Sequence, residues 1–277
     1  MKNLFCLSFL AISVSASAQY YYKDLVAADE IKLQMKTYIA NNIKRVTSTG
    51  YTPAGATTND YNETQQIDAI RRQINITTIN NLSVNWFVYK FDDNGRLQTS
   101  IDSTSIYKSI SAYTYDNAGN ITEIKNTMID SAHDFTQTEI HSWQYKNNKP
   151  EKMWRTINKS DSLEVRFQTD ENGNVIEEQN FKRGKGIDPT YYYYDNKNRL
   201  TDIVRYNVRA KRLLPDYLFE YDEANLVIQK ITTTSNYNLG YLTWRYLYDE
   251  KGLKTKEALF NKEKQLQGRI DYSYITN

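Results

Sequence analysis

The chain has 277 residues, with 35 Lys and Arg against 33 Asp and Glu, and a formal net charge of +2. This balance excludes a global nucleic-acid or polyanion-binding signature, so any charge effect must come from a local group of side chains. A content of 24 tyrosines, 4 prolines and 1 cysteine favours strands over helices and excludes a fold that depends on disulfides.

The first predicted element is a secretory signal peptide over residues 1–18. Met1-Lys2-Asn3 is followed by the apolar run LFCLSFLAISV and by Ala16-Ser17-Ala18, which is the layout of an export signal. We expect cleavage before Gln19 and an exported protein of the periplasm or the cell surface. Cys6 lacks the small flanking residues of a lipoprotein site, so we expect no lipid anchor. No later apolar run is long enough to cross a bilayer, so we expect no membrane span.

Residues 19–85 are predicted to hold one amphipathic helix and an irregular or strand-containing lead-in. Apolar residues recur at helical spacing from Asp24, the expected N-cap, to about residue 42. We expect this helix to pack against the first hairpins and to cover the first edge of the sheet. Residues 52–65 indicate a loop, and residues 73–78 indicate a strand.

Residues 86–277 repeat one phrase, in which a pair of aromatic residues precedes a turn sequence. Examples are YKFDDNGRL from Tyr89, YTYDNAGNI from Tyr113, FQTDENGNV from Phe167 and YYYDNKNRL from Tyr192. The second position of the pair recurs about every 26 residues, which is typical of a repeat architecture. It stands at Phe91, Tyr115, Tyr145, Thr169, Tyr194, Tyr221, Tyr248 and Tyr274.

Each phrase predicts a strand, a tight turn and a returning strand. The leading Asp can accept backbone N–H bonds, and the later Gly or Asn tolerates the positive φ that a hairpin with a G1 bulge requires. The two rings lie two residues apart and so share one face of the strand. The turn at Tyr145–Pro150 is the exception, since it lacks both Asp and Gly.

The repeat defines the expected fold class, an all-β repeat protein with one N-terminal amphipathic helix. Seven units and a terminal strand give roughly fifteen strands. An open sheet of that width is expected to curl. We therefore predict tandem antiparallel β-hairpins that form a curved sheet or a hairpin solenoid.

The motif aromatic-x-Tyr-Asp-x-x-Gly-Asn/Arg-Leu/Ile, over about residues 86–277, resembles the YD repeat of the Rhs and teneurin families. The resemblance implies tandem hairpins that spiral into a shell, and such repeats have often been called carbohydrate-binding. In large family members the shell encloses a C-terminal toxin or another domain. Because this sequence ends just after Tyr274, we expect a small exported form of the repeat protein without a toxin domain.

The sequence contains no recognised catalytic or cofactor-binding motif, so we expect a non-catalytic protein without a cofactor. His133 and His141, with Asp134 and Glu139, could suggest a metal site, but their spacing matches no recognised ligand pattern. We interpret both histidines as surface residues and expect no metal. The repeated turn aspartates could suggest calcium, but capping the turn is a sufficient role for them.

Two groups of residues are candidates for ligand binding. Trp143, Trp154 and Trp244 are the residues that a glycan-binding protein would stack on sugar rings, and the alternative is that the regularly spaced rings are structural. Basic residues follow two neighbouring hairpins and would form one strip along a margin of the sheet. The alternative for them is a charged edge that prevents aggregation. These basic residues are Lys182, Arg183, Lys185, Arg209, Lys211 and Arg212.

The sequence therefore predicts an exported binding or scaffold module of the cell envelope. Its expected partner is an acidic envelope polysaccharide or another envelope protein, and not nucleic acid. A glycan-binding protein that uses exposed Trp and Tyr is the first alternative, and an enzyme of unknown class is the second. An outer-membrane barrel is the rival fold, but residues 175–180 place carboxylates on both faces of a strand whose lipid-facing row should be apolar.

Overall fold

The computed structural model describes residues 20–81, 83–187, 189–207, 210–233 and 240–276. The predicted signal peptide and its cleavage point lie outside these residues. The described chain forms one helix and a sheet of 19 strands, whose neighbours pair antiparallel. In chain order the elements are α1 (Lys23–Ala40), β1 (Arg45–Tyr51), β2 (Thr57–Asp68), β3 (Gln73–Ile79), β4 (Val84–Phe91), β5 (Leu97–Ser103), β6 (Tyr107–Tyr115), β7 (Ile121–Asp130), β8 (Phe135–Lys146), β9 (Lys149–Ile157), β10 (Asp161–Thr169), β11 (Val175–Lys182), β12 (Lys185–Gly186), β13 (Thr190–Tyr194), β14 (Leu200–Asn207), β15 (Arg212–Tyr221), β16 (Val227–Thr233), β17 (Tyr241–Tyr248), β18 (Lys254–Phe260) and β19 (Leu266–Ile275).

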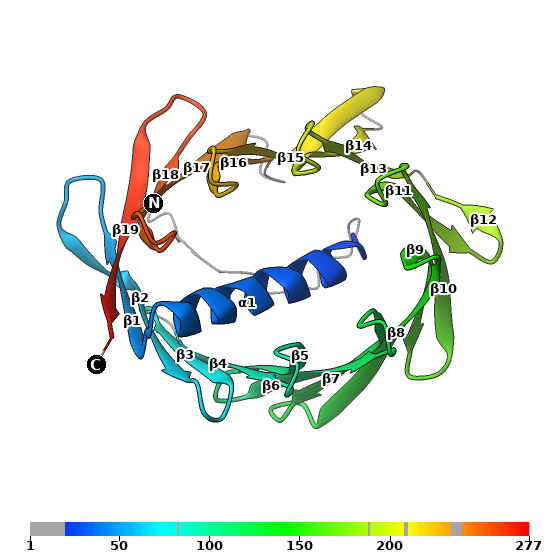
Figure 1. Cartoon of the computed structure of the whole chain (residues 1–277), viewed down its shortest axis with the longest axis horizontal. Coiled ribbons are helices and arrows are strands. Elements are labelled where there is room, and N and C mark those ends of the chain that lie inside the picture. Colours follow the sequence, from blue (N-terminus) through cyan, green and yellow to red (C-terminus); the bar gives the residue numbers. More distant parts are fainter. Residues whose placement is uncertain (1–19, 82, 188, 208–209, 234–239, 277) are drawn as a thin grey trace.

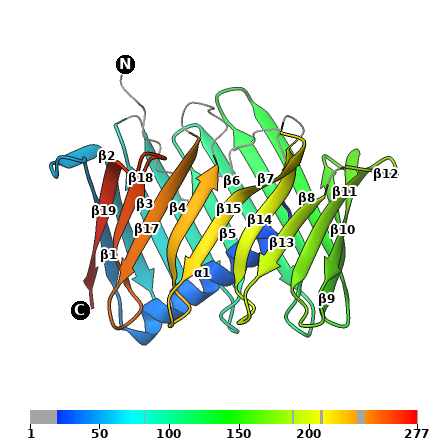
Figure 2. The same cartoon turned by 90° about the horizontal axis from the view of Figure 1, so that it is seen from above.

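The sheet closes on itself, so the prediction of an open curved sheet or a solenoid is wrong. β1 pairs with β2 on one side and with β19 on the other, with Arg45 opposite Ile275. The result is a closed antiparallel barrel of 18 strands around one helix (Figure 1). β12 stands outside the ring, because β11 pairs directly with β13 and β12 projects beside β11 (Figures 1 and 2). Within the described residues each of the 18 strands of the ring pairs with a neighbour on both sides, so the ring itself has no open strand edge.

The strands that allow closure come from the stretch that the sequence indicated as irregular. β2 begins at Thr57, inside the loop predicted at residues 52–65, so that prediction is wrong from Thr57 onward. Its side chains alternate between buried and less buried positions from Tyr61 to Ile67. Several of the buried ones are polar, among them Glu63 and Gln65, which is why the composition did not indicate a strand. β3 agrees with the strand predicted at residues 73–78.

The repeated turns form as predicted. In the first, the Asp92 amide donates to the Arg96 carbonyl and the Gly95 amide donates to the Asp92 carbonyl. The Asp92 carboxylate accepts the amides of Asn94 and Arg96 at 2.9 and 2.8 Å, and Gly95 has a φ of 72°. A register shift follows Lys90, which is the expected bulge. Because the strands alternate in direction, these turns all lie at one end of the barrel, here called the turn rim, and the connections beyond Ile79, Ser103 and Lys182 lie at the opposite end, the loop rim (Figure 2).

The turn that lacks both Asp and Gly uses asparagine instead. Asn147 and Asn148 have φ values of 53° and 59°, and Lys146 lies opposite Lys149. Two consecutive positive φ values in a two-residue hairpin define a type I′ turn, which Asn tolerates. The hairpin therefore forms with a different turn from its neighbours.

The repeated second aromatic residue connects each unit to the one before it. Its hydroxyl donates to the carbonyl of the residue that starts the preceding returning strand: Tyr115 to Leu97 at 2.7 Å, Tyr145 to Ile121 at 3.0 Å, Tyr194 to Val175 at 2.9 Å, Tyr221 to Leu200 at 2.7 Å, Tyr248 to Val227 at 3.0 Å and Tyr274 to Lys254 at 2.7 Å. Thr169 cannot reach that far. At its unit the Lys149 amine donates to the carbonyls of Asp170 and Glu171, each at 3.0 Å.

The helix lies inside the barrel (Figure 1). The prediction that it covers the first edge of the sheet is therefore wrong. Its residues Ala28, Met35 and Tyr38 are buried in a core that the inner faces of the strands complete. Tyr22 occupies the N-cap position without a side-chain cap, and Asp24 falls in the first turn, so the predicted N-cap is wrong. An apolar helix face needs a cover, and the inner wall of the closed barrel supplies it.

Candidate ligand-binding surfaces

A buried carboxylate on the inner wall holds the N-terminal end of α1. Glu178 of β11 is 2% exposed. Its oxygens accept the Tyr21 amide at 2.9 and 3.1 Å, the Tyr22 amide at 2.9 Å and the Tyr192 hydroxyl at 2.8 Å. A carboxylate at this end of a helix satisfies amides that have no helical partner and complements the helix dipole. Burial raises the pKa of Glu178 to about 7, although its three donors oppose the shift.

His141 of β8 makes the second contact between the wall and the helix. Its Nδ1 lies 2.5 Å from Asp24 in the first turn of α1, and its Nε2 lies 2.7 Å from Glu139. The Tyr21 ring packs against the imidazole edge-on, with the ring centroids 5.2 Å apart. Burial lowers the pKa of His141, but the two carboxylates outweigh burial and raise it to about 9. A protonated His141 therefore links two carboxylates, one on the helix and one on the wall.

The interpretation of both histidines as surface residues is thus wrong for His141, which is 8% exposed. His133 is exposed, and its Nδ1 lies 2.8 Å from Asp130. Period-two alternation could have placed His141 inside, because it lies two residues before the inward-facing Trp143. Alternation could not have found Glu178, because the bulge at Val175 shifts the pattern by one residue.

A second charged group on the inner wall is also satisfied by its neighbours. The Lys254 amine lies 3.1 Å from Glu257 and stands over the rings of Tyr246 and Tyr272, at 4.6 and 5.5 Å from their centroids. The Tyr272 hydroxyl donates to Glu257 at 3.1 Å. Glu257 is 5% exposed, so this buried charge is paired and hydrogen-bonded, as burial requires.

In the residues that the structure describes, no group of three or more His, Cys, Asp or Glu side chains could hold a metal ion. Within the same residues, no helix is both long and apolar enough to cross a membrane.

The predicted basic residues lie at the loop rim, on two connections. Lys182, Arg183 and Lys185 are exposed on the β11–β12 hairpin, and Lys211 and Arg212 are exposed where β15 begins. Within the described part of the chain none of these five side chains makes an ion pair. Arg209 lies outside the described residues. The two connections share a rim because β11 and β14 both run away from the turn rim.

The three predicted tryptophans do not form one surface. Trp143 is 4% exposed and stacks on Phe167, with the ring centroids 5.1 Å apart, so its ring belongs to the core. Trp154 and Trp244 are partly exposed. Trp154 is on β9 and Trp244 is on β17, where it lies opposite Lys230.

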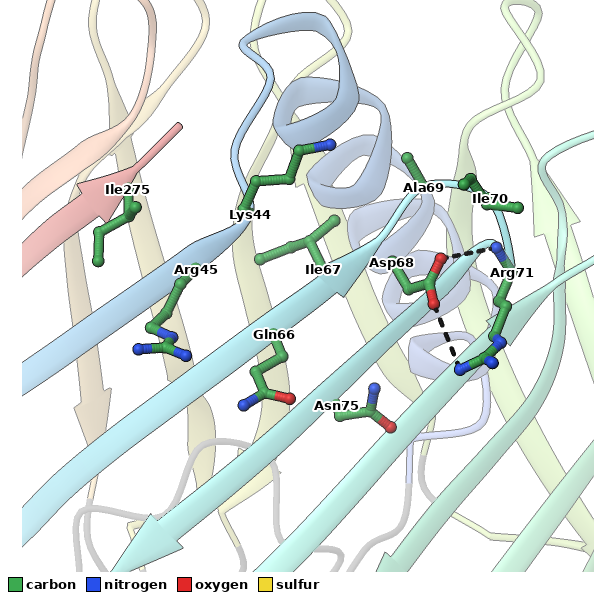
Figure 3. A pocket seen from close by; sticks show the side chains of 10 residues that line it. All are labelled: Lys44, Arg45, Gln66, Ile67, Asp68, Ala69, Ile70, Arg71, Asn75 and Ile275. Carbon is green, nitrogen blue, oxygen red and sulfur yellow. Dashed lines mark hydrogen bonds and ion pairs between the residues drawn. The ribbon is translucent and has the colours of Figure 1, made fainter. Parts of the chain in front are cut away.

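The structure also contains a hollow that the sequence did not indicate, here called the rim hollow (Figure 3). It lies at the turn rim where β19, β1, β2 and β3 are neighbours, and its volume is about 630 Å³. Asp68 accepts the Arg71 amide at 2.8 Å and lies 3.7 Å from the Arg71 guanidinium. The residues that line the hollow are Lys44, Arg45, Gln66, Ile67, Asp68, Ala69, Ile70, Arg71, Asn75 and Ile275.

Comparisons with known proteins give distant structural likenesses. No protein-family model matches the chain, and no curated protein matches it, whereas 36 chains of solved structures do. The Tc holotoxin pore of Photorhabdus luminescens is 16% identical, over 77% of this chain and 11% of that chain, with a TM-score of 0.35. The present chain thus spans 11% of the length of that toxin chain.

Two further solved structures match over most of their length. A porin-like protein from Bacteroides uniformis is 13% identical, over 84% of this chain and 98% of that chain, with a TM-score of 0.40. A DUF1329 family protein from Desulfovibrio piger is 9% identical, over 90% of each chain, with a TM-score of 0.22.

Proposed function

We propose that the chain is an exported, non-catalytic binding module of the cell envelope and that its ligand is an acidic polysaccharide. The observation that carries the proposal is the β11–β12 hairpin, which projects outside the barrel (Figure 2) and holds Lys182, Arg183 and Lys185 exposed. Lys211 and Arg212 extend the basic surface along the same rim. On a chain with a net charge of +2, such a local excess of cations attracts a polyanion.

Two further points support the proposal. Export follows from the predicted signal peptide at residues 1–18. A non-catalytic role agrees with the use of the buried titratable groups, because Glu178 and His141 are engaged in holding α1 to the wall. Both side chains are also buried, with Glu178 2% and His141 8% exposed, so a substrate in solution does not reach them.

Retention on an immobilised acidic polysaccharide at low salt tests the proposed function. The test variant is Lys182→Ser/Arg183→Asn/Lys185→Ser, in which Asn replaces Arg183 because that residue has a φ of 53° and Asn tolerates positive φ. The proposal predicts that the wild type is retained, that retention falls steeply as salt is added, and that the variant is released.

The matched control removes three other exposed charges, in Lys90→Ser/Lys197→Ser/Lys251→Ser, away from the hairpin. The control variant should be retained like the wild type. Equal retention of the hairpin variant and the control variant would contradict the proposal. The basic residues of the hairpin would then serve only as a charged margin that prevents aggregation.

A glycan-binding role through tryptophan has less support. Trp143 is buried in the core, and Trp154 and Trp244 lie on separate strands. Binding of a neutral oligosaccharide that Trp154→Ala or Trp244→Ala abolishes would favour that role over the present proposal.

A further inference from the structure

The rim hollow presents a row of side chains across four neighbouring strands. Antiparallel pairing places Ile275 opposite Arg45, Arg45 opposite Gln66, and Gln66 opposite Asn75. These side chains share the outer face of the barrel, since the residues that follow them along the strands, such as Val46 and Ile67, are buried inside. Neighbouring strands lie about 4.8 Å apart, so the row from Arg45 to Asn75 spans roughly 10 Å.

The row offers hydrogen-bond donors and positive charge. The Asn75 amide oxygen already accepts from the Gln73 side chain, which leaves the Asn75 NH₂ group to face the hollow. Asp68 is the one acidic residue in the lining, and its contacts are with Arg71. Within the described residues Arg45 and Lys44 have no ion pair. Three cations against one carboxylate therefore favour an anionic ligand.

The spacing of the donors selects the kind of anion. Arg45 stands at one end of the row, Asn75 and Arg71 stand toward the other end, and Gln66 lies between them (Figure 3). A single phosphate or carboxylate could engage one end and would leave the other unused. An extended chain with carboxylates at both ends of a segment of roughly 10 Å, and hydroxyl groups between them, would engage the whole row.

The edges of the hollow are apolar. Ile70, at the tip of the β2–β3 turn, is 93% exposed, and Ile275 is 46% exposed. Exposed isoleucines beside a donor row can cover the C–H faces of a sugar ring, which have no hydrogen bonds to lose. An acidic peptide also offers carboxylates, and its main-chain carbonyls can accept from Gln66 and Asn75, but it has no sugar-ring face to lie against the isoleucines.

We propose that the rim hollow is a second binding site, which takes a short segment of a linear uronate chain through Arg45, Gln66, Asn75 and Arg71. It shares the acidic-glycan ligand class with the proposed function but consists of different residues at the opposite rim. A short oligosaccharide therefore separates the two sites, because it fills the hollow without needing the long-range charge of the hairpin.

Calorimetric titration of the full chain with trigalacturonate, at low salt, tests this proposal. Binding is expected for trigalacturonate, with an affinity about tenfold or more above that of galacturonate, because the monomer engages one charged end. Arg45→Gln and Arg71→Gln should each weaken trigalacturonate binding by about tenfold or more. Gln66→Glu, which places a carboxylate in the middle of the row, should abolish binding.

Arg245→Gln, which removes a charge from an exposed position on β17, is the control and should bind like the wild type. Thermal unfolding of each variant shows whether it is folded. If an arginine variant does not fold, Gln66→Glu still tests the proposal. Absence of trigalacturonate binding, equal binding of maltotriose, or unchanged binding in Arg45→Gln and Arg71→Gln would overturn the proposal. Tighter binding of tri-aspartate would assign the hollow to acidic peptides instead.

The hairpin variant Lys182→Ser/Arg183→Asn/Lys185→Ser distinguishes this proposal from the proposed function. It should lose retention on the long polysaccharide and keep its affinity for trigalacturonate. Loss of trigalacturonate binding in the hairpin variant alone would place the short ligand on the hairpin and remove it from the rim hollow.

Discussion

Replacement of Glu178 by Ala should detach the N-terminal end of α1 from the wall of the barrel. The change leaves the amides of Tyr21 and Tyr22 and the hydroxyl of Tyr192 without their acceptor. A buried donor left without a partner costs about 1 kcal/mol or more, so three of them predict a loss of about 3 kcal/mol in the free energy of unfolding. Burial disfavours the charged carboxylate and raises its pKa to about 7. Removing Glu178 also removes this burial penalty, which offsets part of the loss in stability.

Urea unfolding at pH 7, followed by tyrosine and tryptophan fluorescence, measures this loss. The matched control is Glu177→Ala, at the residue before Glu178. The Glu177 carboxylate accepts from the Gln168 side-chain amide at 2.8 Å, in an exposed contact. The control should stay within about 0.5 kcal/mol of the wild type, as is usual for surface substitutions. Equal stability of Glu178→Ala and Glu177→Ala would refute the role of Glu178 as the anchor of the helix.

The isosteric variant Glu178→Gln adds a pH signature to the same experiment. Because the pKa of Glu178 is raised from 4.5 to about 7, the folded state binds the proton more tightly than the unfolded state. The contribution of this group to stability is complete below pH 4.5 and is lost as the pH rises through about 7. Glu178→Gln should flatten the stability profile between these values, and an unchanged profile would contradict the assignment.

Three further predictions concern the second anchor, the turns and the tyrosine contacts. The pKa of His141 is raised from 6.5 to about 9, so the protonated imidazole contributes up to about 3 kcal/mol to the free energy of unfolding. This contribution is complete below pH 6.5 and is lost as the pH rises through about 9. Urea unfolding from pH 6 to 10 should show the fall in stability in the wild type and not in His141→Asn. Gly119 has a φ of 90°, so Gly119→Val should lower the free energy of unfolding by about 1–2 kcal/mol or more, and equal melting temperatures for Gly119→Val and Ala118→Val would contradict the turn assignment. Tyr248→Phe removes a hydroxyl that donates to a main-chain carbonyl at 3.0 Å and should cost about 1 kcal/mol, whereas the same change at the exposed Tyr206 should have little effect, and thermal unfolding of both checks the difference.

Local chemistry allowed the turns to be predicted from the sequence. In Asp92 to Arg96 the residues that form the turn are also the residues that bond to one another, so the turn needs nothing from the rest of the chain. That the two rings of each pair share one face of the strand follows in the same way from the period of a strand. The helix was also predictable, since its buried residues recur at helical spacing.

Closure could not be predicted, because it depends on residues that are far apart in the sequence. β1 pairs with β19, and nothing local to Thr47 indicates that Ser273 will lie beside it. β2 was missed because its buried positions include Glu63 and Gln65, which bond to each other and to Thr78 and Tyr38. A polar strand of this kind becomes recognisable only when its partners are known.

The candidate sites show the same limit. The basic residues at 182–185 were found from composition, because a group of charges is visible in the sequence. The rim hollow was not, since Arg45, Gln66 and Asn75 come from three strands and meet only through their register. Glu178 was missed because a bulge changes the face on which it lies.

A disulfide between β1 and β19 tests the closed barrel most directly. In a Cys6→Ser background, Thr47→Cys and Ser273→Cys place the two new thiols on directly opposed residues, whose Cβ atoms lie about 4.5–5.5 Å apart in such a pair. The closed barrel predicts rapid oxidation to a disulfide within one monomer, detected by mass spectrometry, and no such bond in the control pair Thr47→Cys/Thr127→Cys on β1 and β7. An open sheet holds its first and last strands apart. Monomers that keep both thiols free, or that form only bonds between chains, would contradict closure.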